Sequence, residues 1–216
     1  LGIATLQDLY QIAAPDVMLT STRDSEIIRA PKNAYPKYCL KMATGTGKTV
    51  VAALDYRNLC EQWKRRPRLL FVAHRKEILH QARRTFREVL KDADFGELLV
   101  DGAEPRRWDF VFASVQSLSA SRLEKLDPKR FDVVIIDEFH HAQAPTYNAL
   151  LDHFQPRELL GLTATPERGD GENIQKYFDY RVAHELRLWD ALRLQLLVPM
   201  HYYGIADGTD LSSLTW

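Results

Sequence analysis

The chain has 216 residues, which suits one large domain with a buried core, alone or with extensions. Its composition, with 45% hydrophobic and 27% charged residues, is ordinary for a globular protein. The formal net charge is zero, so no global field marks a nucleic-acid-binding protein. No apolar run approaches the length of a membrane span.

The two cysteines, Cys39 and Cys60, lack metal-ligand spacing, and no signal-peptide pattern opens the chain. We therefore expect reduced thiols and a cytoplasmic protein. Because the first residue is Leu1 and not Met, we also expect a piece of a longer polypeptide.

Strand and helix patterns alternate after a poorly defined extension over residues 1–35. Predicted strands are Tyr38–Lys41, Leu69–Ala73, Leu98–Val100, Phe110–Ala113, Val133–Ile136, Leu159–Leu162 and Val198–Tyr203. Predicted helices are Lys48–Trp63, Lys76–Leu90, Pro145–Phe154 and Leu188–Leu196. Several strands are continuously apolar, so we predict an α/β domain with a mostly parallel sheet and helices on both faces. The looser pattern after Gly169 is interpreted as the exit from the domain.

A glycine-containing loop joins the first predicted strand to the first long helix. Such a loop directs backbone N–H groups and the positive end of a helix dipole at one point, which suits a phosphate chain. Lys48 is expected to reach the β- and γ-phosphates, and the Thr49 hydroxyl to bind Mg²⁺. Met42 replaces the first Gly of the Walker A (P-loop) pattern. The remaining expected phosphate-binding residues are Thr44, Gly45, Thr46 and Gly47.

A second phosphate motif follows the predicted strand Val133–Ile136. The strand ends in Asp137 and Glu138, at the edge of a parallel sheet where ligands bind. Asp137 is predicted to hold Mg²⁺, which prefers oxygen ligands. Glu138 is the candidate catalytic base that orients and deprotonates the attacking water. His140 completes the DExH form of the Walker B box and is expected to contact the γ-phosphate region.

These motifs resemble, in the same order, those of superfamily 2 helicases and translocases. Ala43–Thr49 resembles motif I, Phe71–Leu79 motif Ia, Ala113–Leu118 a later nucleic-acid motif, Asp137–His140 motif II and Leu162–Pro166 motif III. From Thr49 to Trp216 the chain is similar to bacterial DExH proteins that can carry a phospholipase-D-like nuclease module. The flank Tyr38–Met42 is similar to that of type III restriction motor subunits.

The resemblance implies a RecA-like ATP-binding domain over residues 36–185, followed at 186–216 by a segment leading to a second RecA-like domain. It implies ATP and Mg²⁺ as cofactors, nucleic acid as partner with DNA favoured over RNA, and a bacterial source. Arg75, Gln116 and Ser117 would contact the nucleic-acid backbone, and Thr163, Ala164 and Thr165 would couple the two sites. The glutamine element that reads adenine in this family is missing here.

The expected function is an ATP-dependent helicase or translocase domain whose isolated fragment is weakly active, because a second domain supplies the arginine finger. Alternatives are the motor of a restriction or DNA-repair nuclease complex, or a P-loop switch without unwinding activity. From Arg57 to Lys91 the sequence has eleven Lys or Arg against three Glu. This run is either a solvated helix face or a basic stripe beside a binding groove.

Overall fold

The structure, a computed structural model, describes residues 37–42, 47–139, 145–164, 182–186 and 188–195. Seven strands form one sheet in the order β3-β4-β2-β5-β6-β1-β7, and every pair is parallel. The strands are β1 (Lys37–Met42), β2 (Leu69–Ala73), β3 (Glu97–Leu99), β4 (Phe110–Ser114), β5 (Val133–Ile136), β6 (Glu158–Thr163) and β7 (Val182–Leu186).

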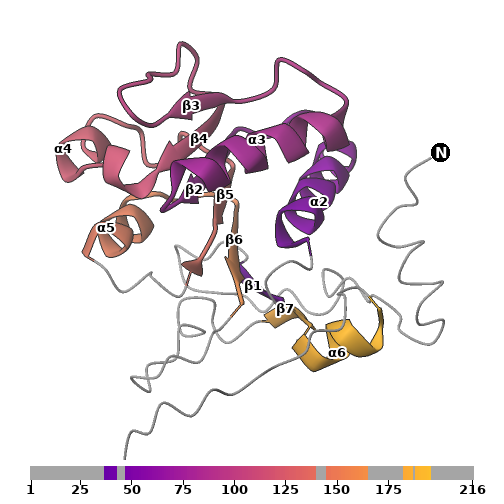
Figure 1. Cartoon of the computed structure of the whole chain (residues 1–216). Coiled ribbons are helices and arrows are strands. Elements are labelled where there is room, and N and C mark those ends of the chain that lie inside the picture. The colour runs from indigo at the N-terminus through magenta and orange to yellow at the C-terminus, as the bar shows by residue number, and fades with distance from the viewer. Residues whose placement is uncertain (1–36, 43–46, 140–144, 165–181, 187, 196–216) are drawn as a thin grey trace, which may run out of the picture.

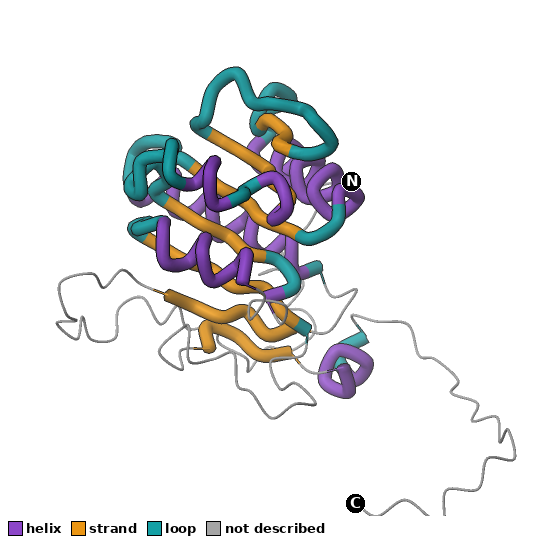
Figure 2. Tube along the Cα trace, turned by 90° about the vertical axis from the view of Figure 1, so that its left-hand side faces the viewer, coloured by secondary structure: helices purple, strands orange, loops and turns teal. Residues whose placement is uncertain are grey.

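Helices cover both faces of this sheet (Figure 1). The described helices are α2 (Lys48–Gln62), α3 (Lys76–Leu90), α4 (Ala120–Leu123), α5 (Pro145–His153) and α6 (Leu188–Arg193), with a 3-10 turn η2 (Val115–Ser117). Helices α2 and α3 lie on one face, and α4 and α5 lie on the other, in front of the strands in Figure 2. None of the helices in the described ranges is long and apolar enough to cross a membrane.

The core is split into two apolar clusters, one on each face of the sheet. Every residue of β2 and β5 is buried, so side chains that alternate along each strand enter both clusters. The first cluster lies under α2 and α3 and holds stacked and edge-on aromatic rings, including Phe71, Phe86 and Phe112. The second lies under α4 and α5. This two-sided burial is the physical reason for the continuously apolar strands in the sequence.

The predicted fold class is confirmed, and most predicted elements agree with the structure to within about two residues. Three elements were not predicted, the 3-10 turn η2, the short helix α4 and the strand β7. Strand β7 pairs with β1. Leu186 in β7 and Ala191 in α6 belong to the first core cluster, so both elements pack on the domain. The predicted strand Val198–Tyr203 lies outside the described residues.

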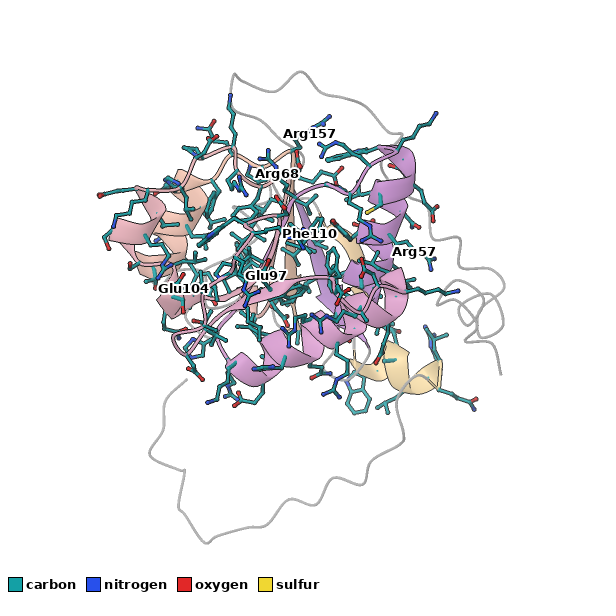
Figure 3. The ribbon with its side chains drawn as sticks, turned by 90° about the horizontal axis from the view of Figure 1, so that it is seen from above. Arg57, Arg68, Glu97, Glu104, Phe110 and Arg157 are labelled. Atoms are coloured by element: carbon teal, nitrogen blue, oxygen red, sulfur yellow. The ribbon has the colours of Figure 1, made fainter. Side chains whose placement is uncertain are left out.

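A buried acid fixes the amino edge of the sheet. The Asp132 carboxylate accepts two hydrogen bonds from the Arg65 guanidinium, at 2.9 and 3.0 Å, and one from the backbone N–H of Arg68 at 2.7 Å. Its backbone carbonyl accepts from the N–H of Arg157 at 2.7 Å. Arg68 and Arg157, labelled in Figure 3, therefore converge on Asp132. The starts of β2, β5 and β6 are tied together at this edge, opposite the site described next.

Candidate nucleotide-binding site

The predicted phosphate motifs meet at the carboxyl edge of the sheet. All strands are parallel, so the segments that follow β1, β6 and β5 emerge on the same side. Strand β6 lies between β1 and β5, with Lys41 opposite Thr163 and Ile136 opposite Gly161. Lys48, Thr163 and Asp137 are consequently placed by three neighbouring strands.

Gly47 begins the helix that faces this edge. Its φ of 85° lies in the left-handed region, where glycine has no steric penalty. Its carbonyl accepts from the N–H groups of Val50 and Val51, at 2.9 and 3.1 Å, so α2 starts immediately after it. Among the described residues, no side chain caps this end, and no acid lies in the first turn. The first N–H groups and the positive end of the helix dipole are thus available to an anion.

Lys48 and Asp137 form the buried charged centre of the site. Their side chains belong to residues only 9% and 4% exposed. Burial raises the pKa of Asp137 to about 6; the charge of Glu138 adds to that rise, while the backbone N–H of Glu138 and the charge of Lys48 oppose it. Since the Lys48 charge acts on Asp137, the two predicted residues are electrostatic neighbours. A positive charge placed here would stabilise the carboxylate.

Glu138 occupies a strained position in the turn after β5. Its φ of 51° is left-handed, which is uncommon for a residue with a side chain. The turn is stabilised by the Asp137 carboxylate, which accepts a hydrogen bond of 2.9 Å from the N–H of Glu138. Strain of this kind is found where the direction of a side chain matters more than local stability.

The residues predicted to couple the two sites lie at the end of β6. Thr163 is fully buried, and Ala164 is half-buried. Thr163 lies on the strand between the P-loop strand and the strand that carries the acid pair, which is the position a coupling residue requires. The other predicted site residues, Thr44, Gly45, Thr46, His140 and Thr165, lie outside the described residues.

The donor set fits a magnesium ion. A Thr49 hydroxyl in the first turn of α2 and the Asp137 carboxylate are oxygen ligands, and Mg²⁺ is held by one or two carboxylates together with substrate phosphates. Within the described ranges, no three His, Cys, Asp or Glu side chains form a metal-binding group.

The predicted nucleic-acid residues lie farther along the same edge. Arg75 follows β2, is exposed and caps the start of α3. Gln116 follows β4, which is paired with β2, and its amide forms a 3.0 Å hydrogen bond with Nδ1 of His74. The Ser117 hydroxyl is 2.8 Å from that of Ser114. The structure therefore brings Arg75 and Gln116 to one surface, whereas the Ser117 hydroxyl is engaged within its own turn.

Two residues at this edge were missed in the sequence. His74 could have been found, because it stands between a predicted strand end and Arg75. Tyr147 carried no signal, because it fits the apolar pattern of α5. It is 2% exposed, and burial, followed by the charges of Asp137 and Glu138, raises its pKa to about 12.

The basic run from Arg57 to Lys91 does not form a continuous stripe. Arg65 and Arg68 pair with Asp132 at the amino edge, and Arg66 pairs with Asp92. Lys76 pairs with Asp101 at 3.0 Å, and Arg87 donates to the carbonyls of Phe95 and Gly96. These five of the eleven basic side chains thus have structural partners.

A parallel sheet with a P-loop after β1 and an Asp-Glu turn after β5 defines the RecA-like class of nucleotide-binding domains, in the form found in superfamily 2 helicases. The sequence profile of the family described as "Type III restriction enzyme, res subunit" matches residues 8–168. The chain belongs to this family.

Individual relatives agree with this class. The chain is 31% identical over 200 residues to a Schizosaccharomyces pombe protein described as "Putative mitochondrial ATP-dependent helicase irc3", covering 86% of this chain and 32% of the relative. It is 28% identical over 166 residues to the type I restriction enzyme EcoAI endonuclease subunit of Escherichia coli, covering 71% of this chain and 20% of the relative.

The solved structure of a nuclease-deletion mutant of the type ISP restriction-modification enzyme LlaGI, in complex with a DNA substrate mimic, has the same fold. The TM-score is 0.57 at 18% identity, covering 74% of this chain and 19% of that chain. The chain therefore spans a third or less of the length of these relatives.

Proposed function

We propose that this chain is the first motor domain of an ATP-dependent DNA helicase or translocase. The observation that carries the proposal is the meeting of Lys48 and Asp137, both buried, at the edge where α2 presents an uncapped amino terminus. Phosphoryl transfer needs mainly positioning and charge neutralisation, and these groups provide both. Family membership supports a nucleic-acid motor.

Each residue has one role in this proposal. The N–H groups after Gly47 and the Lys48 ammonium bind the phosphate chain. Thr49 and Asp137 hold Mg²⁺, which when bound neutralises charge on the phosphate oxygens. Glu138 orients the attacking water and accepts its proton. Thr163 connects the two motifs through strand β6.

DNA is the proposed track, in a bacterial cytoplasm. The support is that two of the relatives above are restriction enzymes and that the LlaGI structure contains a DNA substrate mimic. Arg75 and Gln116 lie at neighbouring strand ends and would contact phosphates, which position the protein without reading sequence. An attached nuclease module, as in a restriction or repair complex, is the second candidate setting.

The test compares three site variants, each with a control variant, in nucleotide binding, ATP hydrolysis and DNA binding. We expect Lys48→Ala to weaken nucleotide binding about 10-fold or more, because a charge-assisted contact is lost. We expect Glu138→Gln to keep binding and lower kcat about 100-fold or more, because the base is lost. Arg75→Ala should weaken binding to a DNA duplex and reduce its salt dependence by about one phosphate contact.

Each control makes the same type of substitution at an exposed residue outside the site. Lys129→Ala and Glu124→Gln change exposed residues in the loops before β5 and after α4, and Arg84→Ala changes an exposed residue farther along α3. These variants should behave as wild type. Wild-type turnover in Glu138→Gln would overturn the assigned base. Tighter binding and stronger stimulation by an RNA of the same sequence would overturn DNA as the track.

A further inference from the structure

Tyr147 carries a buried hydroxyl that the fold itself does not use. The residue is 2% exposed, and among the described residues its hydroxyl has no hydrogen-bond partner. An unpaired hydroxyl in the interior costs stability, and buried tyrosines usually find an acceptor. An unpaired hydroxyl beside the predicted phosphate motifs therefore suggests a hydrogen-bond acceptor that becomes available only when a ligand binds.

The surroundings of Tyr147 identify that partner. Its ring belongs to the same buried cluster as Ile136 and Phe139, the residues that flank the acid pair on either side. The negative charges of Asp137 and Glu138 both act on the phenol, with Asp137 the stronger of the two. Helix α5 thus brings Tyr147 into the cluster that contains both neighbours of the acid pair, within electrostatic reach of the predicted magnesium ligand.

The Asp137 carboxylate has room for a further donor. One oxygen, Oδ1, accepts the N–H of Glu138 at 2.9 Å. A carboxylate offers about four lone-pair positions, so a metal ion and one more hydrogen bond can be added. Donors of this kind hold a ligating carboxylate in one orientation and are needed for full metal affinity.

We propose that Tyr147 is a positioning residue whose hydroxyl donates a hydrogen bond to the Asp137 carboxylate when Mg²⁺ and nucleotide are bound. The inference rests on the proposed function, since it assigns Asp137 to the metal. In the nucleotide-free protein the hydroxyl has no hydrogen-bond partner among the described residues, and on binding it orients the carboxylate toward the ion. Tyr147 does not touch the reacting atoms.

The test compares Tyr147→Phe with Tyr56→Phe. Both remove only a hydroxyl from a buried ring, but the Tyr56 hydroxyl donates to the Pro67 carbonyl at 2.6 Å and packs in the cluster under α2 and α3. The readout is binding of a fluorescent ADP analogue as Mg²⁺ is titrated, with the melting temperature of the Mg²⁺-free protein recorded in parallel.

We expect Tyr147→Phe to raise the Mg²⁺ concentration for half-saturation about 10-fold, and not to lower the melting temperature of the Mg²⁺-free protein. Tyr56→Phe should lower the melting temperature and leave the Mg²⁺ dependence unchanged. In an Asp137→Asn background, Tyr147→Phe should add no further loss, because its effect passes through that carboxylate.

Two results would overturn the inference while the proposed function stands. One is Mg²⁺ half-saturation of Tyr147→Phe within about twofold of wild type, well short of the expected effect. The other is a drop in its Mg²⁺-free melting temperature as large as that of Tyr56→Phe, which would show a structural partner for the hydroxyl. A wild-type protein that binds no nucleotide at any Mg²⁺ concentration would overturn the proposed function, and this inference with it.

Discussion

The buried carboxylate of Asp137 destabilises the nucleotide-free protein, and its proposed role as a metal ligand explains why it is there. The carboxyl group is buried beside the acid Glu138, and its pKa is raised to about 6 because burial outweighs the attraction of Lys48. At neutral pH the nucleotide-free protein therefore keeps an unfavourable negative charge in its interior. A bound cation would remove that penalty, so the same residue weakens the empty domain and favours its loaded form.

Asp137→Asn is accordingly expected to stabilise the nucleotide-free protein at pH 7 by about 1–3 kcal/mol, since each pKa unit corresponds to about 1.4 kcal/mol. The amide oxygen can still accept from the N–H of Glu138. Chemical denaturation measures the gain, and Mg²⁺-dependent nucleotide binding should be weakened, but still measurable, in the same protein. Asp152→Asn, on the exposed side of α5, should change neither. A destabilised Asp137→Asn protein would contradict this account.

Asp132, at the amino edge of the sheet, has a lowered pKa, whereas that of Asp137 is raised. Burial disfavours its charge, but the hydrogen bonds from Arg65 and the N–H of Arg68, with the charges of both arginines, outweigh burial and lower its pKa below the ordinary 3.8. A lowered folded-state pKa stabilises the protein above the ordinary value, and this contribution is lost as pH falls through the folded-state pKa.

Asp132→Asn should therefore lower the free energy of unfolding by about 2 kcal/mol at pH 7, because it removes a buried carboxylate that accepts hydrogen bonds from the exposed Arg65 and from the N–H of Arg68. The difference from wild type should shrink as pH falls from about 4 toward 2, since both proteins then lack the charge. Urea unfolding at several pH values gives the comparison. Asp127→Asn, at an exposed turn, should run parallel to wild type. A difference in the free energy of unfolding that grows as pH falls would contradict a lowered pKa of Asp132 in the folded protein.

At the scale of elements, the turn into β3 depends on one glycine. Gly96 and Gly102 both have a φ of 80°. A Cβ on Gly96 would overlap the ring of Phe112 in β4, whereas nothing lies within 4 Å of a Cβ on Gly102. The turn before β3 thus packs directly on the neighbouring strand, and the turn after β3 does not.

The two glycines allow a matched comparison. Ala at either position meets the same backbone strain, about 1 kcal/mol, but Gly96→Ala must also displace the Phe112 ring. We expect Gly96→Ala to be less stable than Gly102→Ala by about 1–3 kcal/mol, the usual cost of overpacking. Denaturant midpoints of the two variants measure this. Equal midpoints would mean that the ring moves aside without cost.

The elements also show where sequence patterns were sufficient. Strands β2 and β5 were predicted with the right bounds, because burial on both faces produces an unbroken apolar run. Strand β7, Val-Ala-His-Glu-Leu, was missed, because it pairs on one side only and contains polar residues. Tyr147 could not be distinguished from an ordinary core residue, because its proposed role depends on which strand end helix α5 packs against, and the sequence does not show that.

At the scale of the whole molecule, the proposed function gives the chain one side of an ATP site. Phosphoryl transfer in this class uses an arginine finger, worth about 10³–10⁵ in kcat, from a second domain. Relatives are longer, and this chain spans 32% of the fission yeast protein. In the proposed function, the described residues at the carboxyl edge would supply phosphate, metal and water contacts, so binding and efficient turnover should be separable.

We therefore expect the 216-residue chain to bind Mg-ATP weakly and to hydrolyse it about 1,000-fold more slowly than a protein extended through a second RecA-like domain. Steady-state ATPase rates of both proteins, with and without DNA, provide the measurement. Strong DNA-stimulated turnover by the short chain alone would show that no external arginine is needed.

The sheet order also bears on how the protein is made. Strand β1 is the first described strand to leave the ribosome, yet its neighbours in the sheet are β6 and β7. It must wait for more than a hundred residues of synthesis before either partner exists, while β2, β3, β4 and β5 can already pair. Such distant pairing is slow. We therefore expect nascent chains to pack β2, β3, β4 and β5 before β1 joins the sheet, so that the proposed nucleotide site forms only in the finished domain.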